Sequence, residues 1–182
     1  TVPSPGLPVT SDTIFDLASV TKVFGTATLA TVLVERGWLS WETPLASILP
    51  RACNGRPSGI TIRHLLSHSA GLVAWEPLWQ RLRARLEGVR IEIPATPSNP
   101  GMLSGADVDK PERLHLLAVE ERQRAMRELV FASAPEVAPG TRTLYSDLSF
   151  LLLGFCLEQV TGMPLDRAVT RFVFEPLGLS SS

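Results

Sequence analysis

A dense apolar run over residues 15–33 opens with a serine and a lysine on one helical face, Ser19 and Lys22. The run predicts a helix over residues 19–36 that is buried on most sides and is ended by Gly37. Side chains three apart on a helix are neighbours, with Cβ atoms roughly 5–6 Å apart. The spacing therefore brings the Lys22 amine within reach of the Ser19 hydroxyl. A lysine at the start of a buried helix is costly unless it has a partner or a chemical role.

The chemistry of these two side chains favours a catalytic role. Serine is a weak nucleophile until a neighbouring group takes its proton. Only Lys22 and Lys110 among the 17 basic residues are lysines, and a desolvated lysine can lose its proton whereas arginine cannot. At a helix start, Ser19 also lies where backbone N–H groups favour a developing negative charge. An S-x-x-K pattern alone is more often a solvated helix start with a snorkelling lysine, so further motifs are needed.

Three further blocks follow in order: HLLSHSAGL at residues 64–72, PGTRTLYSDLSFLLLGFCLEQVTGMPLD at residues 139–166 and FEPLGL at residues 174–179. Together with FDLASVTK at residues 15–22, they resemble the serine β-lactamase and penicillin-binding protein superfamily. Within it, they resemble the class C-like branch, which also holds D-aminopeptidases and β-lactamase-fold carboxylesterases. The resemblance implies an α+β, β-lactamase/transpeptidase-like fold, of which this chain covers mainly the helical part, with few strands.

The resemblance implies three catalytic residues. Ser19 would be the acylated nucleophile, Lys22 its proton partner and Tyr145 the tyrosine of the Y-x-N element. A phenol beside a lysine ammonium has its anion favoured, so it can act first as a base and then as an acid. The alternative for Tyr145, the only tyrosine in the chain, is a half-buried side chain with its hydroxyl on a backbone carbonyl.

We assign Asp147, His68, Ser69 and Trp75 to substrate binding. Asp147 stands where the commoner motif has asparagine, and an ionised aspartate can only accept hydrogen bonds. A carboxylate near Lys22 would also favour the ammonium form and shift the work of a base to Tyr145. This departure suggests an altered substrate preference and weakens the case for a dedicated β-lactamase.

No metal or other cofactor is expected. His64 and His68 have the spacing of zinc-binding helices, but Leu65 replaces the glutamate of H-E-x-x-H and only His115 remains as a third histidine. We interpret both as structural histidines that position the loop near Ser19.

The family's third element, K-T-G or H-x-G, should lie far beyond Tyr145, yet the sequence ends at Ser182 and no lysine follows Lys110. We therefore expect residues 1–182 to form a single, incomplete domain. Its parts are the nucleophile helix and HLLSH block (13–72), an insertion or lid-like segment (73–134), and the tyrosine motif with the following helices (135–182). Such a segment should expose an apolar face and should self-associate, bind its missing portion or aggregate.

The proline-rich insertion is the part where the resemblance is weakest. A long insertion beside a site is typically a lid or a wall that selects substrates. Trp75, Trp79 and Leu82 would supply its apolar face toward the pocket, or they would simply pack on the core. The sequence leaves both alternatives open.

Local patterns predict the remaining elements. They are a short helix after Pro44, a helix over residues 62–67 capped by Thr61, an amphipathic helix over 75–86, a helix from Pro111 to residue 131, a helix over 146–160 closed by Gly162, and a helix over 164–174.

The leading hypothesis is a serine hydrolase that acts through an acyl-enzyme on small esters or amides, including D-amino acid peptides or β-lactams. The alternative is a non-catalytic ligand-binding or scaffold module that lacks the third motif. The net charge of −1 gives no electrostatic reason to bind nucleic acid or an anionic membrane. No apolar run reaches 18 residues, so we expect no membrane-spanning segment.

Overall fold

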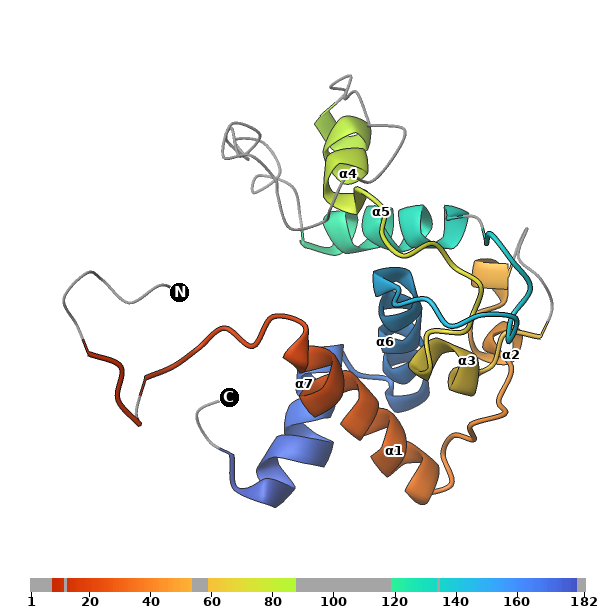
Figure 1. Ribbon diagram of the computed structural model, residues 1–182. Coiled ribbons are helices and arrows are strands. Elements are labelled where there is room, and N and C mark those ends of the chain that lie inside the picture. The colour runs from red at the N-terminus through yellow and green to blue at the C-terminus, as the bar shows by residue number, and fades with distance from the viewer. Residues whose placement is uncertain (1–7, 12, 54–58, 88–118, 134, 180–182) are drawn as a thin grey trace.

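The computed structural model describes residues 8–11, 13–53, 59–87, 119–133 and 135–179, and it is largely helical (Figure 1). Within these ranges the extended pairings are two isolated bridges, Pro44 with Thr61 and Leu72 with Pro135. The expectation of a mainly helical chain is confirmed. The helices are η1 (Lys22–Ala27), α1 (Thr28–Glu35), α2 (Leu45–Ile48), η2 (Pro50–Cys53), α3 (Ile62–Leu66), α4 (Leu78–Glu87), α5 (Val119–Ala132), α6 (Asp147–Thr161), α7 (Leu165–Val169), η4 (Thr170–Phe174) and η5 (Glu175–Leu177).

The helix predicted over residues 19–36 is present as helical turns from Val20 to the end of α1. Its end follows from Gly37, which adopts a left-handed φ of 72° and donates its N–H to the Val34 carbonyl at 2.9 Å. The sequence pattern did not predict that η1 is a π-helix. Such wider turns are rare overall, and those that occur are often found at functional sites.

The expectation that this helix is buried on most sides is wrong. One side packs against α6, α7 and η4, and Leu29 and Leu33 there are fully buried. On the other side, Val20 is 48%, Val23 63% and Phe24 57% exposed. Density of apolar residues predicts that a face needs covering, but it does not say whether the covering element belongs to the described part of the chain.

Helix α6 forms the centre of the core (Figure 1). Ser146 caps its start by accepting a hydrogen bond from the Ser149 N–H, and Gly162 ends it with a φ of 66°, as predicted. Four of its leucines and a cysteine are fully buried: Leu148, Leu152, Leu153, Cys156 and Leu157. Each such leucine contributes about 1.5–3 kcal/mol of transfer free energy, so α6 is the fixed support on which the site rests.

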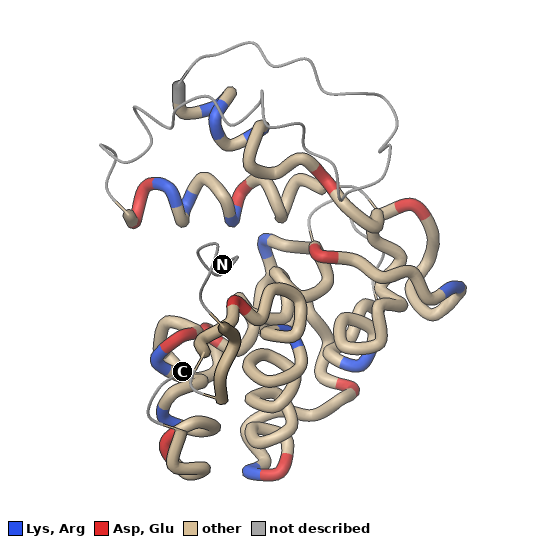
Figure 2. The backbone as a smooth tube through the Cα atoms, turned by 60° about the vertical axis from the view of Figure 1, so that its left-hand side comes forward, with Lys and Arg blue, Asp and Glu red and all other residues tan. Residues whose placement is uncertain are grey.

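Helices α4 and α5 pack against each other, and α5 also contacts α6. They carry many of the charged residues, whereas the tube around α6 is mostly uncharged (Figure 2). Leu82 of α4 is 5% exposed and packs with Ala125 and Leu129 of α5. The pocket-facing alternative for Leu82 is therefore wrong, because the α4–α5 contact uses it. Residues 88–118, which include the proline-rich part of the insertion and the predicted helix start at Pro111, lie outside the described residues.

By length and composition, no single described helix could cross a membrane; only α6 taken together with Leu165–Leu177, bent by 71°, passes that test as a pair.

Candidate active site

Ser19 lies in a tight turn at the entrance of the helix. The preceding Ala18 has a left-handed φ of 44°, a conformation that residues other than glycine rarely adopt. The turn is fastened by the Ala18 N–H, which donates to Asp16 Oδ1 at 2.8 Å, and by the Val20 N–H, which donates to the Leu17 carbonyl at 2.9 Å. This backbone leaves the Ser19 side chain exposed. Within the described residues the Ser19 N–H donates to no backbone acceptor, so no described carbonyl competes with a ligand for it.

Lys22 is the centre of the polar site. Its Nζ donates to Ser19 Oγ at 3.2 Å, so the amine is within hydrogen-bond reach of the hydroxyl, as the sequence spacing predicts. The same Nζ lies 2.8 Å from Asp147 Oδ1 and 5.2 Å from the ring centroid of Tyr145. The start of the first helix and the start of α6 therefore bring four sequence-predicted residues together around one ammonium group.

The charges of these groups depend on one another. Burial alone would lower the pKa of Lys22, but hydrogen bonds to Asp147 and Tyr145, and their negative charges, raise it overall above its usual 10.5. Hydrogen bonding to Lys22, and next to Ser19, lowers the pKa of the Tyr145 phenol below its usual 10.0. The arrangement thus holds lysine as an ammonium and favours a tyrosine anion.

The HLLSHSAGL block positions the tyrosine motif. Backbone and side-chain hydrogen bonds join residues 68–74 to residues 144–147. They run from the Leu144 N–H to the His68 carbonyl (2.9 Å), from the Ser146 hydroxyl to the Val73 carbonyl (2.7 Å) and from the Asp147 N–H to the Ala74 carbonyl (3.2 Å). Tyr145 therefore reaches Lys22 because a segment far away in the sequence holds its backbone.

His68 supports this contact from behind. Its Nδ1 accepts a hydrogen bond from the Ser146 N–H at 3.0 Å. The centroid of its ring lies 4.5 Å from the ring centroid of Tyr145 and 4.9 Å from that of Phe150. Burial lowers the pKa of His68, which suits a neutral ring that accepts at Nδ1. The side chain is placed to hold Tyr145 in position rather than to line a substrate pocket.

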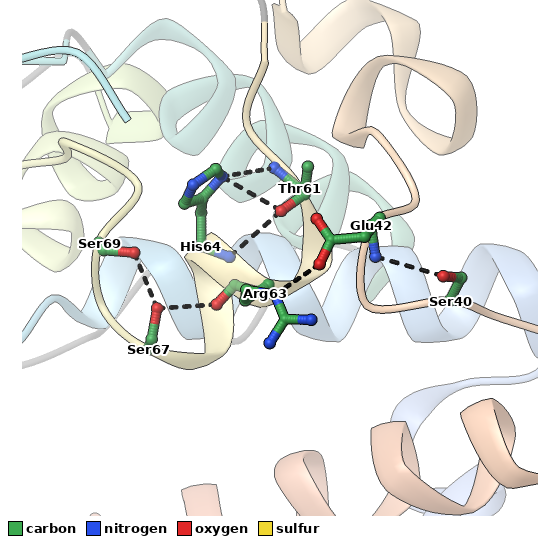
Figure 3. A network of polar contacts seen from close by, with 7 residues as sticks. All are labelled: Ser40, Glu42, Thr61, Arg63, His64, Ser67 and Ser69. Atoms are coloured by element: carbon green, nitrogen blue, oxygen red, sulfur yellow. Dashed lines mark hydrogen bonds and ion pairs between the residues drawn. The ribbon is translucent and has the colours of Figure 1, made fainter. Parts of the chain in front are cut away.

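Ser69 and His64 are also engaged in structure (Figure 3). The Ser69 hydroxyl pairs with that of Ser67 at 2.8 Å. His64 Nδ1 accepts from the Thr61 N–H at 3.2 Å, which completes a capping box at the start of α3. Among the described residues, no group of three or more His, Cys, Asp or Glu side chains could hold a metal ion.

Gly71 is a positioning residue that the sequence analysis missed. It has a φ of 77°, and a Cβ atom there would lie 2.0 Å from the Val137 carbonyl oxygen. Its own carbonyl accepts from the Glu136 N–H at 2.8 Å. The available signal was the glycine at the end of HLLSHSAGL, since a glycine that punctuates a loop often marks a close backbone approach.

A cavity of about 670 Å³ opens beside Ser19. Lys22 and Asp147 line it, as do Trp75 and Trp79, whereas His68, Ser69 and Tyr145 do not. Trp75 and Trp79 therefore face this cavity, which is one of the two alternatives that the sequence left open for them. A smaller cavity of about 210 Å³ lies along α5 and shares none of these residues.

Comparisons with known proteins agree with the motifs. The beta-lactamase family model matches residues 3–182. The esterase EstB of Burkholderia gladioli is 36% identical over an alignment of 180 positions, which covers 96% of this chain and 39% of the relative. A protein of Escherichia coli K12, provisionally named a D-alanyl-D-alanine carboxypeptidase, is 30% identical over an alignment of 180 positions, which covers 94% of this chain and 34% of the relative.

Among solved structures, the beta-lactamase/D-alanine carboxypeptidase from Pseudomonas syringae matches with a TM-score of 0.61 and 30% identity. The match covers 97% of this chain and 38% of that structure. The chain thus spans less than two fifths of the length of each of these relatives. Because the family model matches nearly every residue, the chain belongs to the beta-lactamase family and represents mainly the helical part of a β-lactamase/transpeptidase-like fold.

Proposed function

We propose that this chain carries the nucleophile of a serine hydrolase that acts on small esters or amides through an acyl-enzyme on Ser19. The observation that carries the proposal is the contact of one ammonium group with Ser19, at 3.2 Å, and with the ring of Tyr145. The names of its relatives, an esterase and D-alanine carboxypeptidases, support the same reaction class. Carboxylic esters, D-amino acid peptides and β-lactams all contain the carbonyl group that such a nucleophile attacks.

In the acylation step, the Tyr145 phenolate accepts the proton of the Ser19 hydroxyl, and the Ser19 oxygen attacks the substrate carbonyl carbon. Tyr145 suits the base because hydrogen bonding to Lys22 and Ser19 lowers its pKa. Lys22 remains an ammonium and stabilises the negative charge as it moves from the phenolate to the serine oxygen. The Ser19 N–H, which has no backbone acceptor among the described residues, binds the oxyanion that forms.

Collapse of this intermediate breaks the bond to the leaving group, which takes the proton back from Tyr145. The acyl group then remains on Ser19. In the second half of the reaction, Tyr145 accepts a proton from a water molecule while the water oxygen attacks the acyl carbonyl. Collapse of this second intermediate breaks the bond to Ser19 and releases the acid, and Tyr145 returns the proton to the Ser19 oxygen. Asp147 keeps Lys22 charged throughout, since its Oδ1 lies 2.8 Å from Nζ.

Covalent labelling tests this function. A fluorophosphonate probe should add one adduct to the intact polypeptide that contains these residues, and peptide mass spectrometry should place it on Ser19. Ser19→Ala should abolish the adduct and lower ester hydrolysis by about a thousandfold or more. Lys22→Arg should be nearly as damaging, because the larger planar guanidinium cannot replace the ammonium between Ser19 and Asp147.

Ser47→Ala is the matched control, because Ser47 is an exposed serine whose hydroxyl donates to the nearby Pro44 carbonyl. It should label and turn over ester as the parent does. An unlabelled Ser19 in a folded protein, or equal labelling of Ser19→Ala, would instead support the non-catalytic module.

A further inference from the structure

The cavity beside Ser19 has a wall of large apolar side chains. They come from α4 and the turn before it, from α5, from α6 and from α7: Trp75, Trp79, Met126, Leu151, Phe155 and Leu165. The volume of about 670 Å³ is within the range of small-molecule sites, which are usually apolar with a few polar groups. Trp79 is 45% exposed, and because its ring is large, it offers apolar surface that a ligand could cover.

The charged groups of the wall already have partners. Besides the Lys22–Asp147 pair, Glu76 pairs with Arg81 and Glu158 pairs with Arg127. Glu158 also accepts a hydrogen bond from the Leu165 N–H at 2.9 Å. A charged substrate group entering the cavity would lose water without gaining an unpaired counter-charge among the described residues, and that loss is costly.

The position of Tyr145 decides which side of the substrate enters. Tyr145 would protonate the leaving group, and it does not line the cavity, whereas Ser19 does. The leaving group therefore departs on the Tyr145 side. The acyl group that stays bonded to Ser19 is the part that faces the apolar wall.

We infer that this cavity is an acyl-binding site that selects uncharged, apolar acyl groups of medium length over acyl groups that end in a carboxylate or an amine. This inference rests on the proposed function, since it assigns the acyl side of an ester bonded to Ser19. Trp79 and its neighbours determine the specificity by covering the acyl chain. Because the carboxylates of Glu76 and Glu158 are already paired, they offer no unpaired charge to an acyl group that ends in a carboxylate or an amine.

Three p-nitrophenyl esters of equal length test the inference on the intact polypeptide: the hexanoyl ester, the 6-aminohexanoyl ester and the mono-ester of adipic acid. The p-nitrophenyl acetate ester reports the chemistry without a long acyl chain. We expect kcat/KM for the hexanoyl ester to exceed kcat/KM for each charged ester by about tenfold or more. It should also exceed kcat/KM for p-nitrophenyl acetate by about tenfold or more. Trp79→Ala should reduce the preference for the hexanoyl over the acetyl ester by about tenfold.

Trp38→Ala is the matched control. Trp38 is 51% exposed, contacts Phe172 and does not line the cavity, so its removal should leave the preference unchanged. Glu158→Gln supplies a gain that a damaged fold cannot imitate. It leaves Arg127 without its carboxylate partner beside the cavity, so the adipoyl ester should become a better substrate relative to the hexanoyl ester.

Two outcomes overturn the inference while leaving the proposed function standing. One is normal acylation of Ser19 by p-nitrophenyl acetate together with equal kcat/KM values for the three longer esters. The other is a preference that Trp79→Ala and Glu158→Gln both leave unchanged. Failure of Ser19 to react even with p-nitrophenyl acetate would overturn the proposed function itself, and the two kinds of failure are therefore distinct.

Discussion

Lys22 interacts with three neighbours through one positive charge. It lies 2.8 Å from Asp147 Oδ1 and 3.2 Å from Ser19 Oγ, and it lowers the pKa of Tyr145. The carboxylate raises the pKa of Lys22, and its negative charge also opposes the phenolate of Tyr145. Asp147 therefore stabilises the Lys22 ammonium but disfavours the Tyr145 phenolate, which is the proposed base.

Replacing Asp147 with asparagine should shift the pH dependence of ester hydrolysis. The proposed base is the phenolate, so kcat/KM falls as the pH drops below the pKa of Tyr145. Removal of the nearby negative charge favours the phenolate and lowers that pKa further. The acid limb of the pH profile should therefore move to lower pH in Asp147→Asn, measured with p-nitrophenyl acetate.

Glu42→Gln serves as the control, because Glu42 is an exposed carboxylate that pairs with Arg63 on the surface. Its pH profile should match the parent. Movement of the acid limb to higher pH in Asp147→Asn would contradict this prediction, because it would mean that the weaker hold on the Lys22 ammonium outweighs the removal of the charge that opposes the phenolate.

At this scale the sequence predicts what local spacing controls. The contact of Ser19 with Lys22 follows from two residues three apart on one helical face, and the motif resemblance adds Tyr145 and Asp147. It does not predict the left-handed φ of Ala18 or the hydrogen bond from its N–H to Asp16. Backbone strain depends on surroundings that a single residue type does not reveal.

The elements of the site are joined by loops rather than by a sheet. Residues 68–74 hold residues 136–147 through successive hydrogen bonds, and Gly71 is the point of closest approach. The helices themselves were predictable from apolar periodicity and caps, as the Thr61 cap of α3 and the Ser146 cap of α6 illustrate. The loop contacts were not, because periodicity carries no information about which loops meet.

Gly71→Ala should therefore destabilise the protein far more than an ordinary loop substitution. It adds a left-handed alanine, which costs about 1–2 kcal/mol, and a clash with the Val137 carbonyl, for which overpacking suggests about 1–3 kcal/mol more. Thermal or urea unfolding should show a loss of about 3 kcal/mol. Any folded fraction should hydrolyse ester poorly, because the Tyr145 segment moves with Val137.

Gly37→Ala separates the two costs. Gly37 has a similar φ of 72°, but a Cβ atom there meets nothing within 4 Å. Only the backbone cost of about 1–2 kcal/mol should appear, with hydrolysis nearly intact. Equal destabilisation by the two variants would show that the contact with Val137 contributes little.

Across the whole molecule, the apolar surface is unevenly distributed. Helix α6 is enclosed, whereas the segment leading into the nucleophile helix presents a continuous exposed series: Ile14, Phe15, Leu17, Val20, Val23 and Phe24. An exposed patch of this kind marks an association surface or a liability to aggregation. The same segment carries Ser19, so whatever covers this face lies close to the site.

The 182-residue chain expressed alone should therefore self-associate through this face. The double variant Val23→Gln, Phe24→Gln removes two exposed apolar side chains without touching the core. It should shift the chain toward the monomer in size-exclusion chromatography with light scattering, and it should lower the fluorescence of a bound anilinonaphthalene sulfonate dye. The unfolding transition should barely change, because both side chains are more than half exposed.

Val119→Gln is the control, since Val119 is 53% exposed on α5 and lies outside the series. If exposed apolar area in general drove association, this variant would reduce it as well. If only the face at Val23 and Phe24 matters, it would not. A chain that is already monomeric at micromolar concentration and binds no dye would show that this face does not drive association. The apolar density of the nucleophile helix would then need another physical explanation than a face awaiting a partner.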